Sequence, residues 1–522
     1  MSQSAEDAAR ARLSRRERLR GAPAGGGQAA APSHAPADAS PAVRPHFAFL
    51  SQDRLAVLRE RAILLLAEHG VVVNHAAAVG RLKEAGARLE GKRLCFPPGL
   101  TEAALSALPN AVTLCGRSPA FDIPLPRPDN TFTMRTGTGA HGFIEAETGA
   151  YRKLVLGDVA TIAAVANGLE RVGIVAHPFV SGVPELTADI HGVAALIAST
   201  PKHVWLQPYG EENTEYLLRI AAAAAGGEAA LRARPIVSCI VTSFTPLEFK
   251  SMDVEAIIQC GRLRVPIHAC SLPSAGGTAP VTMPGVILMA AAEILSMAVM
   301  THVLAPGTPF IATPLIFGLD LRTGRSLQAS VEALQGTAIA VQLMKHGFGM
   351  ITHTYGSGSD TPDVDGQSQA ERALLGQIVG LAGADILGGV GQLECATVFS
   401  PVQAVLDDEY GAMLQHFLRT PAVDDETLAW QAMLAVKHGG NFLATPHTLW
   451  HCRANFEPLA FQRLGREAYE AAGRRTALER AREICRRLVD EHAASSLLDA
   501  ASLREIDSIV KAADAQILKG QI

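Results

Sequence analysis

The side chains best suited to chemistry gather in residues 349–372, where a short apolar run leads into a glycine- and serine-rich loop. In chain order they are His353, Tyr355, Asp360, Asp365 and Gln367. A buried strand that empties polar groups into a glycine-rich loop is a common way for α/β proteins to build active sites. The alternative is an ordinary strand–loop–helix connection in which Asp365 caps the following helix. Both interpretations stay open on the sequence alone.

Further polar side chains follow other short apolar runs. They are Thr136, Thr138, His141, His177, Gln207, Tyr209, Thr242, Ser243, His268, Ser271 and Thr313. If these runs are parallel strands of one barrel, the residues at their C-terminal ends converge on a single mouth. Any one of the histidines, taken alone, is more often a hydrogen-bonded structural residue than a functional one. Their shared position at predicted strand ends makes the set a candidate site.

The apolar runs alternate with helical segments along the chain. The predicted strands are Thr131–Arg135, Gly173–Val180, Val204–Tyr209, Ile236–Thr242, Pro266–Ala269, Pro309–Ala312, Gly349–His353 and Asp385–Gly388. Parallel strands need crossover connections, so this alternation indicates a parallel sheet. We predict an α/β fold built on a closed (β/α)8 TIM barrel, with an open doubly wound sheet as the alternative. No G-x-G-x-x-G motif follows the first strand, so nothing favours a dinucleotide cofactor.

The regions around the barrel complete the predicted organisation. Residues 1–44 are rich in Ala, Pro and Gly and predict a disordered tail. Residues 45–125 are expected to form an N-terminal cap, 126–400 the barrel, and 401–522 a C-terminal helical extension packed on the barrel. Within the cap, Ser51 should precede one helix and Ala76–Glu84 should form another.

Composition narrows the class of protein. The net charge of −5 in 522 residues gives no electrostatic reason to expect nucleic acid. The eight cysteines form no C-x-x-C pair, which is typical of reduced thiols in a cytoplasmic protein. The apolar stretch Val286–Ala305 carries Glu293 and His302, whose burial in lipid would be costly. We therefore interpret it as a buried core helix and expect no membrane association.

Four stretches of the sequence form a pattern that is specific in its order and spacing. They are Thr136-Gly-Thr-Gly-Ala-His-Gly-Phe-Ile-Glu-Ala-Glu-Thr-Gly149, Ser274-Ala-Gly-Gly-Thr-Ala-Pro-Val281, Ser357-Gly-Ser-Asp with Asp365-Gly-Gln367 and Glu371, and Gly439-Gly-Asn-Phe-Leu with His447-Thr448. Through them the sequence resembles the trimethylamine methyltransferase (MttB-like) family of corrinoid-dependent methyltransferases, over nearly the whole chain from about residue 45 onward. The family has a TIM barrel, which agrees with the strand pattern.

The resemblance implies transfer of a methyl group from a methylated amine to the cob(I)amide of a separate corrinoid protein. Archaeal trimethylamine enzymes of the family place pyrrolysine near the stretch that matches Asp360–Gln367, where this chain has only standard residues. Thr361-Pro362 also stands where the family often has Ser-Lys. A quaternary amine such as a betaine is therefore the expected methyl donor, because its positively charged nitrogen leaves as a neutral amine without a proton donor.

Roles follow from this implied reaction. We expect Tyr355, Asp360, Asp365 and Gln367 closest to the chemistry, with substrate contacts from Gln207, Tyr209, His268, His353, Thr138 and His141 and cofactor contacts from Gly356 and Gly358. Aromatic faces or the carboxylates of Asp360 and Asp365 would hold the cation. Donors such as His268, His353, Gln207 or Arg135 would hold a betaine carboxylate. We expect a homo-oligomer, no bound metal and no tightly bound cofactor.

Two rival functions remain. One is a metal-dependent TIM-barrel hydrolase in which His177, His268 and His353 converge, although no H-x-H pair occurs in the chain. The other is a non-catalytic methylamine-binding paralogue. Metal analysis tests the first, and a methyl-transfer assay separates the second from an enzyme.

Overall fold

A parallel barrel forms the centre of the molecule. The computed structural model describes residues 44–492 and 497–521, so the predicted tail 1–44 falls almost entirely outside the described residues. The barrel strands are β6 (Thr133–Thr136), β9 (Val172–Ala176), β10 (His203–Leu206), β11 (Val237–Thr242), β13 (Ile267–Ser271), β14 (Phe310–Pro314), β17 (His353–Tyr355) and β18 (Ile386–Val390). Each predicted strand corresponds to one of them.

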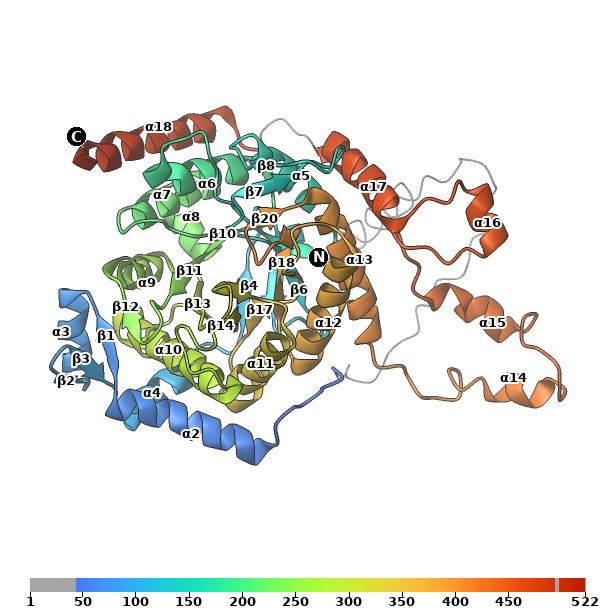
Figure 1. The fold of residues 1–522 in the computed structure, drawn as a ribbon, viewed down its shortest axis with the longest axis horizontal. Helices are drawn as coiled ribbons and strands as arrows, with labels where there is room; N and C mark the ends of the chain where they lie inside the picture. Colours follow the sequence, from blue (N-terminus) through green and yellow to red (C-terminus); the bar gives the residue numbers. More distant parts are fainter. Residues whose placement is uncertain (1–43, 493–496, 522) are drawn as a thin grey trace.

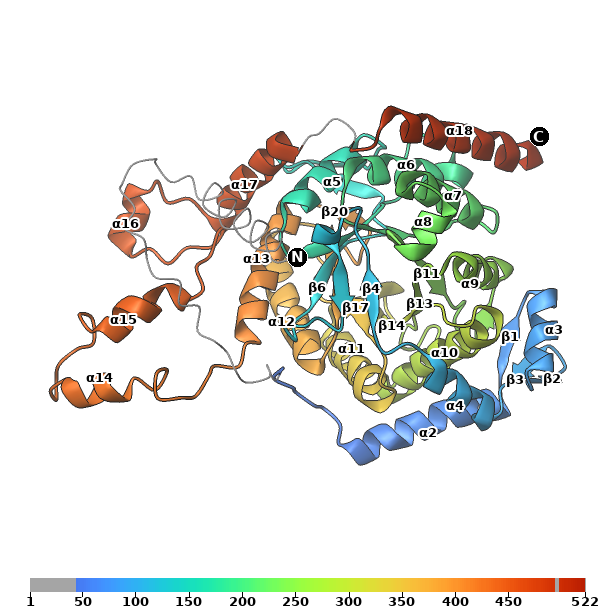
Figure 2. The same cartoon turned by 180° about the vertical axis from the view of Figure 1, so that it is seen from behind.

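Neighbouring strands in the barrel are consecutive along the chain. All pairs are parallel, and β18 returns to pair with β6. The remaining seam is closed by a parallel bridge between Ala312 and Thr352, with the Ala312 N–H donating to the Ile351 carbonyl at 2.9 Å. The predicted closed barrel is confirmed, and Figures 1 and 2 show its strands ringed by helices.

The outer helices alternate with the strands as the sequence predicts. They are α5 (Asp158–Gly168), α6 (Ala188–Ser199), α7 (Asn213–Ala225), α8 (Glu228–Ala233), α9 (Ser251–Leu263), α10 (Met283–Leu304), α11 (Val331–Gln342), α12 (Gly366–Ala382) and α13 (Pro401–Phe417). Among the described residues, α10 alone is long and apolar enough to cross a membrane, and 78% of its most apolar window is buried inside the protein. Buried Glu293 accepts four hydrogen bonds there, which agrees with a core helix.

The two ends of the barrel are closed differently. The antiparallel hairpin of β4 (Val112–Leu114) and β5 (Ile123–Leu125) covers the N-terminal end, where the His203 ring lies 2.9 Å from the Cys115 carbonyl. The C-terminal end carries a sheet of β19 (Gln392–Leu393), β20 (Val398–Phe399), β7 (Gly142–Ile144) and β8 (Tyr151–Lys153), and the hairpin of β15 (Gly318–Asp320) and β16 (Arg325–Leu327). Each end of the barrel is therefore covered by short strands outside the eight-stranded sheet.

The N-terminal cap packs against one side of the barrel. Its helices are α2 (Gln52–Glu68), α3 (Ala76–Glu84) and α4 (Pro98–Ala107), and its strands β1 (Val71–Val73), β3 (Arg93–Cys95) and β2 (Arg88–Glu90) extend a sheet from β12 (Glu248–Phe249). Ser51 caps α2 by accepting the Arg54 N–H. Both predicted cap helices form, and α2 and α4 lie against α10.

The C-terminal region follows α13 and contains α14 (Trp430–Ala435), α15 (Pro446–His451), α16 (Arg466–Ala471), α17 (Ala477–His492) and α18 (Ala500–Ile517). The last two return to the barrel, α17 beside α5 and α13 and α18 along α6 and α7. In contrast, α14 and α15 project away from the barrel in both views (Figures 1 and 2).

Candidate active site

Four large side chains from alternating strands form a layer across the barrel interior. Arg135 comes from β6, Trp205 from β10, His268 from β13 and His353 from β17. The Arg135 guanidinium lies over the Trp205 ring at 4.4 Å, and its Nε donates to His353 Nε2 at 3.3 Å. The His268 ring centroid lies 4.2 Å from that of Trp205 and 5.3 Å from that of His353. Successive side chains of a strand point to opposite faces of the sheet, and these four side chains point into the barrel.

Arg135 is a buried cation without an acidic partner. Its side chain is 1% exposed, and among the described residues no carboxylate forms an ion pair with it. It contacts Trp205, His353 and the Thr136 carbonyl, to which Nη1 donates at 2.7 Å. Burial lowers the pKa of Arg135, and burial also lowers the pKa values of His268 and His353 well below the usual histidine range. Both histidines are therefore neutral at pH 7.

Above this layer lie aromatic and amide side chains. Burial raises the pKa of Tyr355 to about 12, so its hydroxyl stays protonated beside Arg135, and its ring meets Phe317 edge-on at 6.3 Å. On the other side of the mouth, Tyr209 stacks on Phe179 at 4.7 Å. Ile240, two residues after Ser238 on β11, is only partly buried.

Gln207 and Thr138 are joined at the mouth. The Thr138 hydroxyl contacts the Gln207 Oε1 at 2.7 Å and the His177 carbonyl at 3.2 Å. Tyr209 is held by Asp189 at the start of α6, whose carboxylate accepts the Tyr209 N–H at 2.9 Å. These contacts give the predicted residues Gln207, Tyr209 and Thr138 fixed positions on one side of the barrel.

The loop after β17 is organised by its carboxylates. The two Asp360 oxygens accept the N–H groups of Gln328 and Ala329 at 2.8 and 2.9 Å, and burial raises the pKa of Asp360. Glu371 on α12 in turn accepts the Ser359 hydroxyl at 2.5 Å and the Asp360 N–H at 3.0 Å. These bonds hold the loop against the β15–β16 hairpin.

Asp365 and Gln367 lie at the exposed start of α12. Asp365 caps this helix, accepting the Ser368 N–H at 2.8 Å, and Gln367 donates to Glu371 at 2.7 Å. The capping alternative recognised in the sequence is therefore correct for Asp365. The expected role of Asp360 and Asp365 as counter-charges to a cation stays a prediction, and their oxygens already accept local hydrogen bonds.

The remaining predicted residues occupy different environments. His141 is exposed on the loop before β7. Gly356 and Gly358 pack tightly, because an added Cβ would lie 2.4 Å from Leu387 at the first and 2.4 Å from Gln328 at the second. Close internal packing thus accounts for both glycines, and their assignment to cofactor contact stays a prediction.

Two glutamines at the mouth were not singled out from the sequence. Gln328 is 2% exposed, and neither its Oε1 nor its Nε2 has a hydrogen-bond partner. Gln392 is fully buried and its Oε1 is also unpartnered, while its Nε2 donates to the Thr138 carbonyl. Unpaired buried amides are costly, so each calls for a ligand or water. Neither glutamine belongs to a motif, and no local pattern indicates it.

The histidines of the predicted hydrolase have other partners. His177 accepts the Gln207 N–H at 3.3 Å, His268 lies 2.9 Å from the Ser238 hydroxyl, and His353 contacts Arg135. Within residues 44–492 and 497–521, no group of three or more His, Cys, Asp and Glu side chains is arranged to hold a metal ion. The structure thus offers no support for the metal-dependent alternative.

Relatives with known functions match most of the chain. Trimethylamine methyltransferase MttB of Desulfitobacterium hafniense (strain DSM 10664 / DCB-2) is 28% identical over 461 residues, covering 87% of this chain and 92% of the relative. Glycine betaine methyltransferase of Desulfitobacterium hafniense (strain Y51) is 26% identical over 409 residues, covering 77% and 84%. Both are methyltransferases of amines by name.

A solved structure agrees at the level of the fold. The crystal structure of the Methanosarcina barkeri monomethylamine methyltransferase superposes with a TM-score of 0.51, covering 85% of this chain and 88% of the other at 11% identity. The family model described as trimethylamine methyltransferase (MTTB) matches residues 17–517. The chain therefore belongs to the trimethylamine methyltransferase family.

Proposed function

We propose that this protein transfers a methyl group from a quaternary amine bearing a carboxylate to the cob(I)amide of a separate corrinoid protein. The proposed class of methyl donor rests on one observation. Arg135 is buried and has no carboxylate partner among the described residues. Burying an unpaired charge costs on the order of several kcal/mol, even after the surrounding protein relaxes. A carboxylate on the substrate would supply the missing partner through the guanidinium fork.

The aromatic rings above Arg135 suit the other end of such a molecule. Tyr355 and Phe317 lie on one side of the mouth, and Tyr209 and Phe179 on the other. Aromatic faces attract quaternary ammonium groups without needing a hydrogen-bond donor on the ligand. A zwitterion would thus place its carboxylate toward Arg135 and its methylated nitrogen toward the aromatic mouth.

The protonation states support this choice of methyl donor. A quaternary nitrogen leaves as a neutral tertiary amine when the N–CH₃ bond breaks, so no acid has to protonate it. His268 and His353 are neutral, and the Tyr355 hydroxyl keeps its proton. The task left to these residues is to orient the N–CH₃ bond and to exclude water. The cobalt(I) of the acceptor supplies the nucleophile.

A corrinoid presented by a partner would meet the C-terminal end of the barrel. A corrinoid ring is fringed with carboxamide groups, which both donate and accept hydrogen bonds. The unpaired atoms of Gln328 and Gln392 could bond to such groups only after a rearrangement that exposes them, because the two residues are 2% and 0% exposed. We assign the Gly356–Gly358 segment to the side that would receive the partner.

The experiment is methylation of cob(I)alamin or a reduced corrinoid protein, followed by absorbance, with glycine betaine, proline betaine, carnitine and trimethylamine. We expect turnover with at least one carboxylate-bearing quaternary amine and slow or no turnover with trimethylamine. Robust use of trimethylamine with none of the quaternary amines accepted would contradict the proposal. Transfer from no amine would support the non-catalytic paralogue.

A further inference from the structure

Residues 419–457, here called the arm, leave the barrel between α13 and the segment that leads to α16. The arm contains α14, α15 and the loops around them, and none of its residues is buried. Figures 1 and 2 show it extending well beyond the outer helices. A segment of this length that buries no core of its own gains little free energy from folding by itself.

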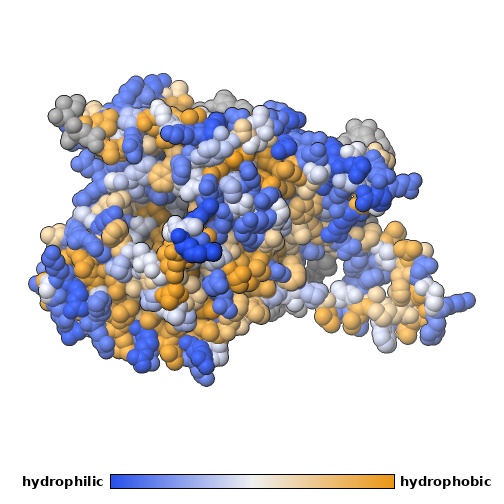
Figure 3. Space-filling model, in the orientation of Figure 1, coloured by the Kyte–Doolittle hydropathy of each residue, from blue (hydrophilic) through white to orange (hydrophobic). Residues whose placement is uncertain are grey.

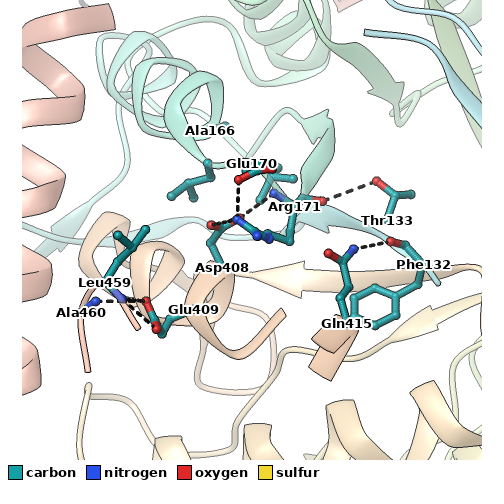
Figure 4. Close-up of polar contacts among 12 residues, drawn as sticks. Phe132, Thr133, Ala166, Glu170, Arg171, Asp408, Glu409, Gln415, Leu459 and Ala460 are labelled. Carbon is teal, nitrogen blue, oxygen red and sulfur yellow. Dashed lines mark hydrogen bonds and ion pairs between the residues drawn. The ribbon is translucent and has the colours of Figure 1, made fainter. Parts of the chain in front are cut away.

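Both ends of the arm are nevertheless fixed to the barrel. Before the arm, Gln415 on α13 donates to the Phe132 carbonyl at 2.8 Å. After it, the Glu409 carboxylate accepts the N–H groups of Leu459 and Ala460 at 2.9 and 3.0 Å (Figure 4). Arg480 also donates to the Ala460 carbonyl at 2.6 Å. The arm is therefore a rooted projection and not a loose terminus.

The surface of the arm is rich in large apolar side chains. These are Val423, Leu428, Trp430, Met433, Leu434, Phe442, Leu443, Leu449 and Trp450, with exposures between 43% and 81%. The arm thus carries Trp430 and Trp450, two of the three tryptophans in the chain. Orange, apolar atoms are visible on this projecting part in Figure 3. Exposed apolar side chains gathered on one segment are typical of protein–protein contact sites.

The apolar area is large enough for a stable interface. Nine large apolar side chains of the arm are exposed, which is enough to supply much of the roughly 800 Å² that each partner buries in a standard interface. Tryptophans are also the residues that most often dominate binding energy. A weak or incidental contact would not need such a surface.

The same chain offers a matching receptor at the base of the arm. A cavity of about 380 Å³ lies between α12 and α13, lined by Gly376, Gln377, Met413, Leu414 and Phe417 among others, and also by Phe456 at the end of the arm itself. The charged side chains in its wall are Arg372, whose guanidinium pairs with Asp407 at 3.0 Å, and Arg463. Exposed Met413 and Phe417 extend the apolar surface around it. The volume of the cavity exceeds that of an indole ring.

We propose that the arm clasps a second copy of this chain and that an arm tryptophan occupies the α12–α13 cavity of that copy. A second copy is favoured because donor and receptor surfaces occur on one polypeptide, so a two-fold axis covers both surfaces of both chains at once. The cavity wall also includes Gly356 and Ser357 of the loop after β17. The partner's tryptophan would therefore support the candidate active-site loop from behind.

The first test is the mass of the full chain by light scattering during size-exclusion chromatography. We expect an oligomer for the unaltered protein and at least a roughly 30-fold weaker association for the W430S/W450S double variant. Val57→Ser, which removes an exposed apolar side chain from α2, serves as the matched control and should leave the mass unchanged. A monomeric unaltered protein, or an oligomer that persists in the double variant, would overturn the proposal.

A complementation test separates clasping from general loss of solubility. Ala373→Trp places a bulky ring in the cavity wall and should block the receptor while leaving the arm intact. Each variant alone should be largely monomeric, whereas a mixture of the arm variant and the cavity variant should regain dimer. The reason is that the cavity variant still has an intact arm, and this arm fits the intact cavity of the arm variant. Failure of the mixture to associate, or binding of the arm only to a corrinoid protein, would contradict a second copy as the occupant.

Discussion

At the scale of single residues, the barrel interior is defined by a cation held among neutral rings. Arg135 contacts Trp205 and His353, and the neighbouring His268 is neutral as well. An arrangement that only needed to fill space would use apolar side chains, since replacing buried charges by apolar groups is often stabilising. The retained charge therefore points to a ligand of opposite sign.

This predicts a specific loss when Arg135 is altered. Arg135→Gln should lower kcat/KM for glycine betaine about 10- to 100-fold, the value of a hydrogen bond between charged groups. Choline has the same trimethylammonium group without a carboxylate, so the rate measured with choline should change little. Arg135→Lys keeps the charge but not the fork and should be intermediate. The ratio of the two rates is the readout, because a folding defect lowers both equally; an unchanged ratio in Arg135→Gln would exclude the assigned role.

At the scale of elements, Glu293 on α10 joins the ends of two strands. Its carboxylate accepts the Ser271 and Ser243 hydroxyls at 2.5 Å, the Thr245 hydroxyl at 2.9 Å and the Leu247 N–H at 2.8 Å. An acidic residue in so apolar a helix is explained by these four donors at the C-terminal ends of β11 and β13. Its function is to position this part of the mouth.

Removing that carboxylate should therefore destabilise the fold. We expect Glu293→Leu to lower the free energy of unfolding by about 3–5 kcal/mol, because buried donors lose their acceptor. Glu293→Gln keeps one acceptor oxygen and should cost less. Urea unfolding measures both, and equal stability of Glu293→Leu and the unaltered protein would show that the donors have other partners.

A pH dependence follows from Asp189 at the start of α6. Burial raises the pKa of Asp189 to about 6, above its ordinary value of 3.8, so the folded state binds the proton more tightly. Stability should then fall as pH rises from about 4 to 6, by up to roughly 3 kcal/mol from this group. In Asp189→Asn that contribution disappears. Comparing the urea midpoints of both proteins across this range tests it, and parallel pH profiles would contradict the assignment.

Elements were more predictable from the sequence than the site was. The eight strands and the cap helices follow from local apolar patterning, as Ala76–Glu84 illustrates. Gln328 and Gln392 were missed because their significance depends on which distant segments surround them, and sequence periodicity carries no such information. Asp365 shows the reverse case, since its capping role was readable from its position before α12.

At the scale of the whole molecule, the C-terminal end of the barrel carries the candidate site and the projecting arm carries the proposed docking surface. The C-terminal end of the strands brings Arg135, Tyr355 and Gln328 together from segments far apart in the chain. Because the arm's proposed receptor lies directly behind the loop after β17, association and methyl transfer would share structural elements. Family membership alone does not specify the methyl donor, so the identity of the substrate has to be measured.

The most direct measurement is product analysis after incubating the protein and cob(I)alamin with glycine betaine or, separately, with trimethylamine. We predict that dimethylglycine and methylcobalamin appear in equal amounts from glycine betaine, because one N–CH₃ bond is broken for each methyl group transferred. Trimethylamine should give little dimethylamine under the same conditions. Dimethylamine formation at a high rate, with glycine betaine recovered intact, would contradict the assignment of this protein to carboxylate-bearing quaternary amines.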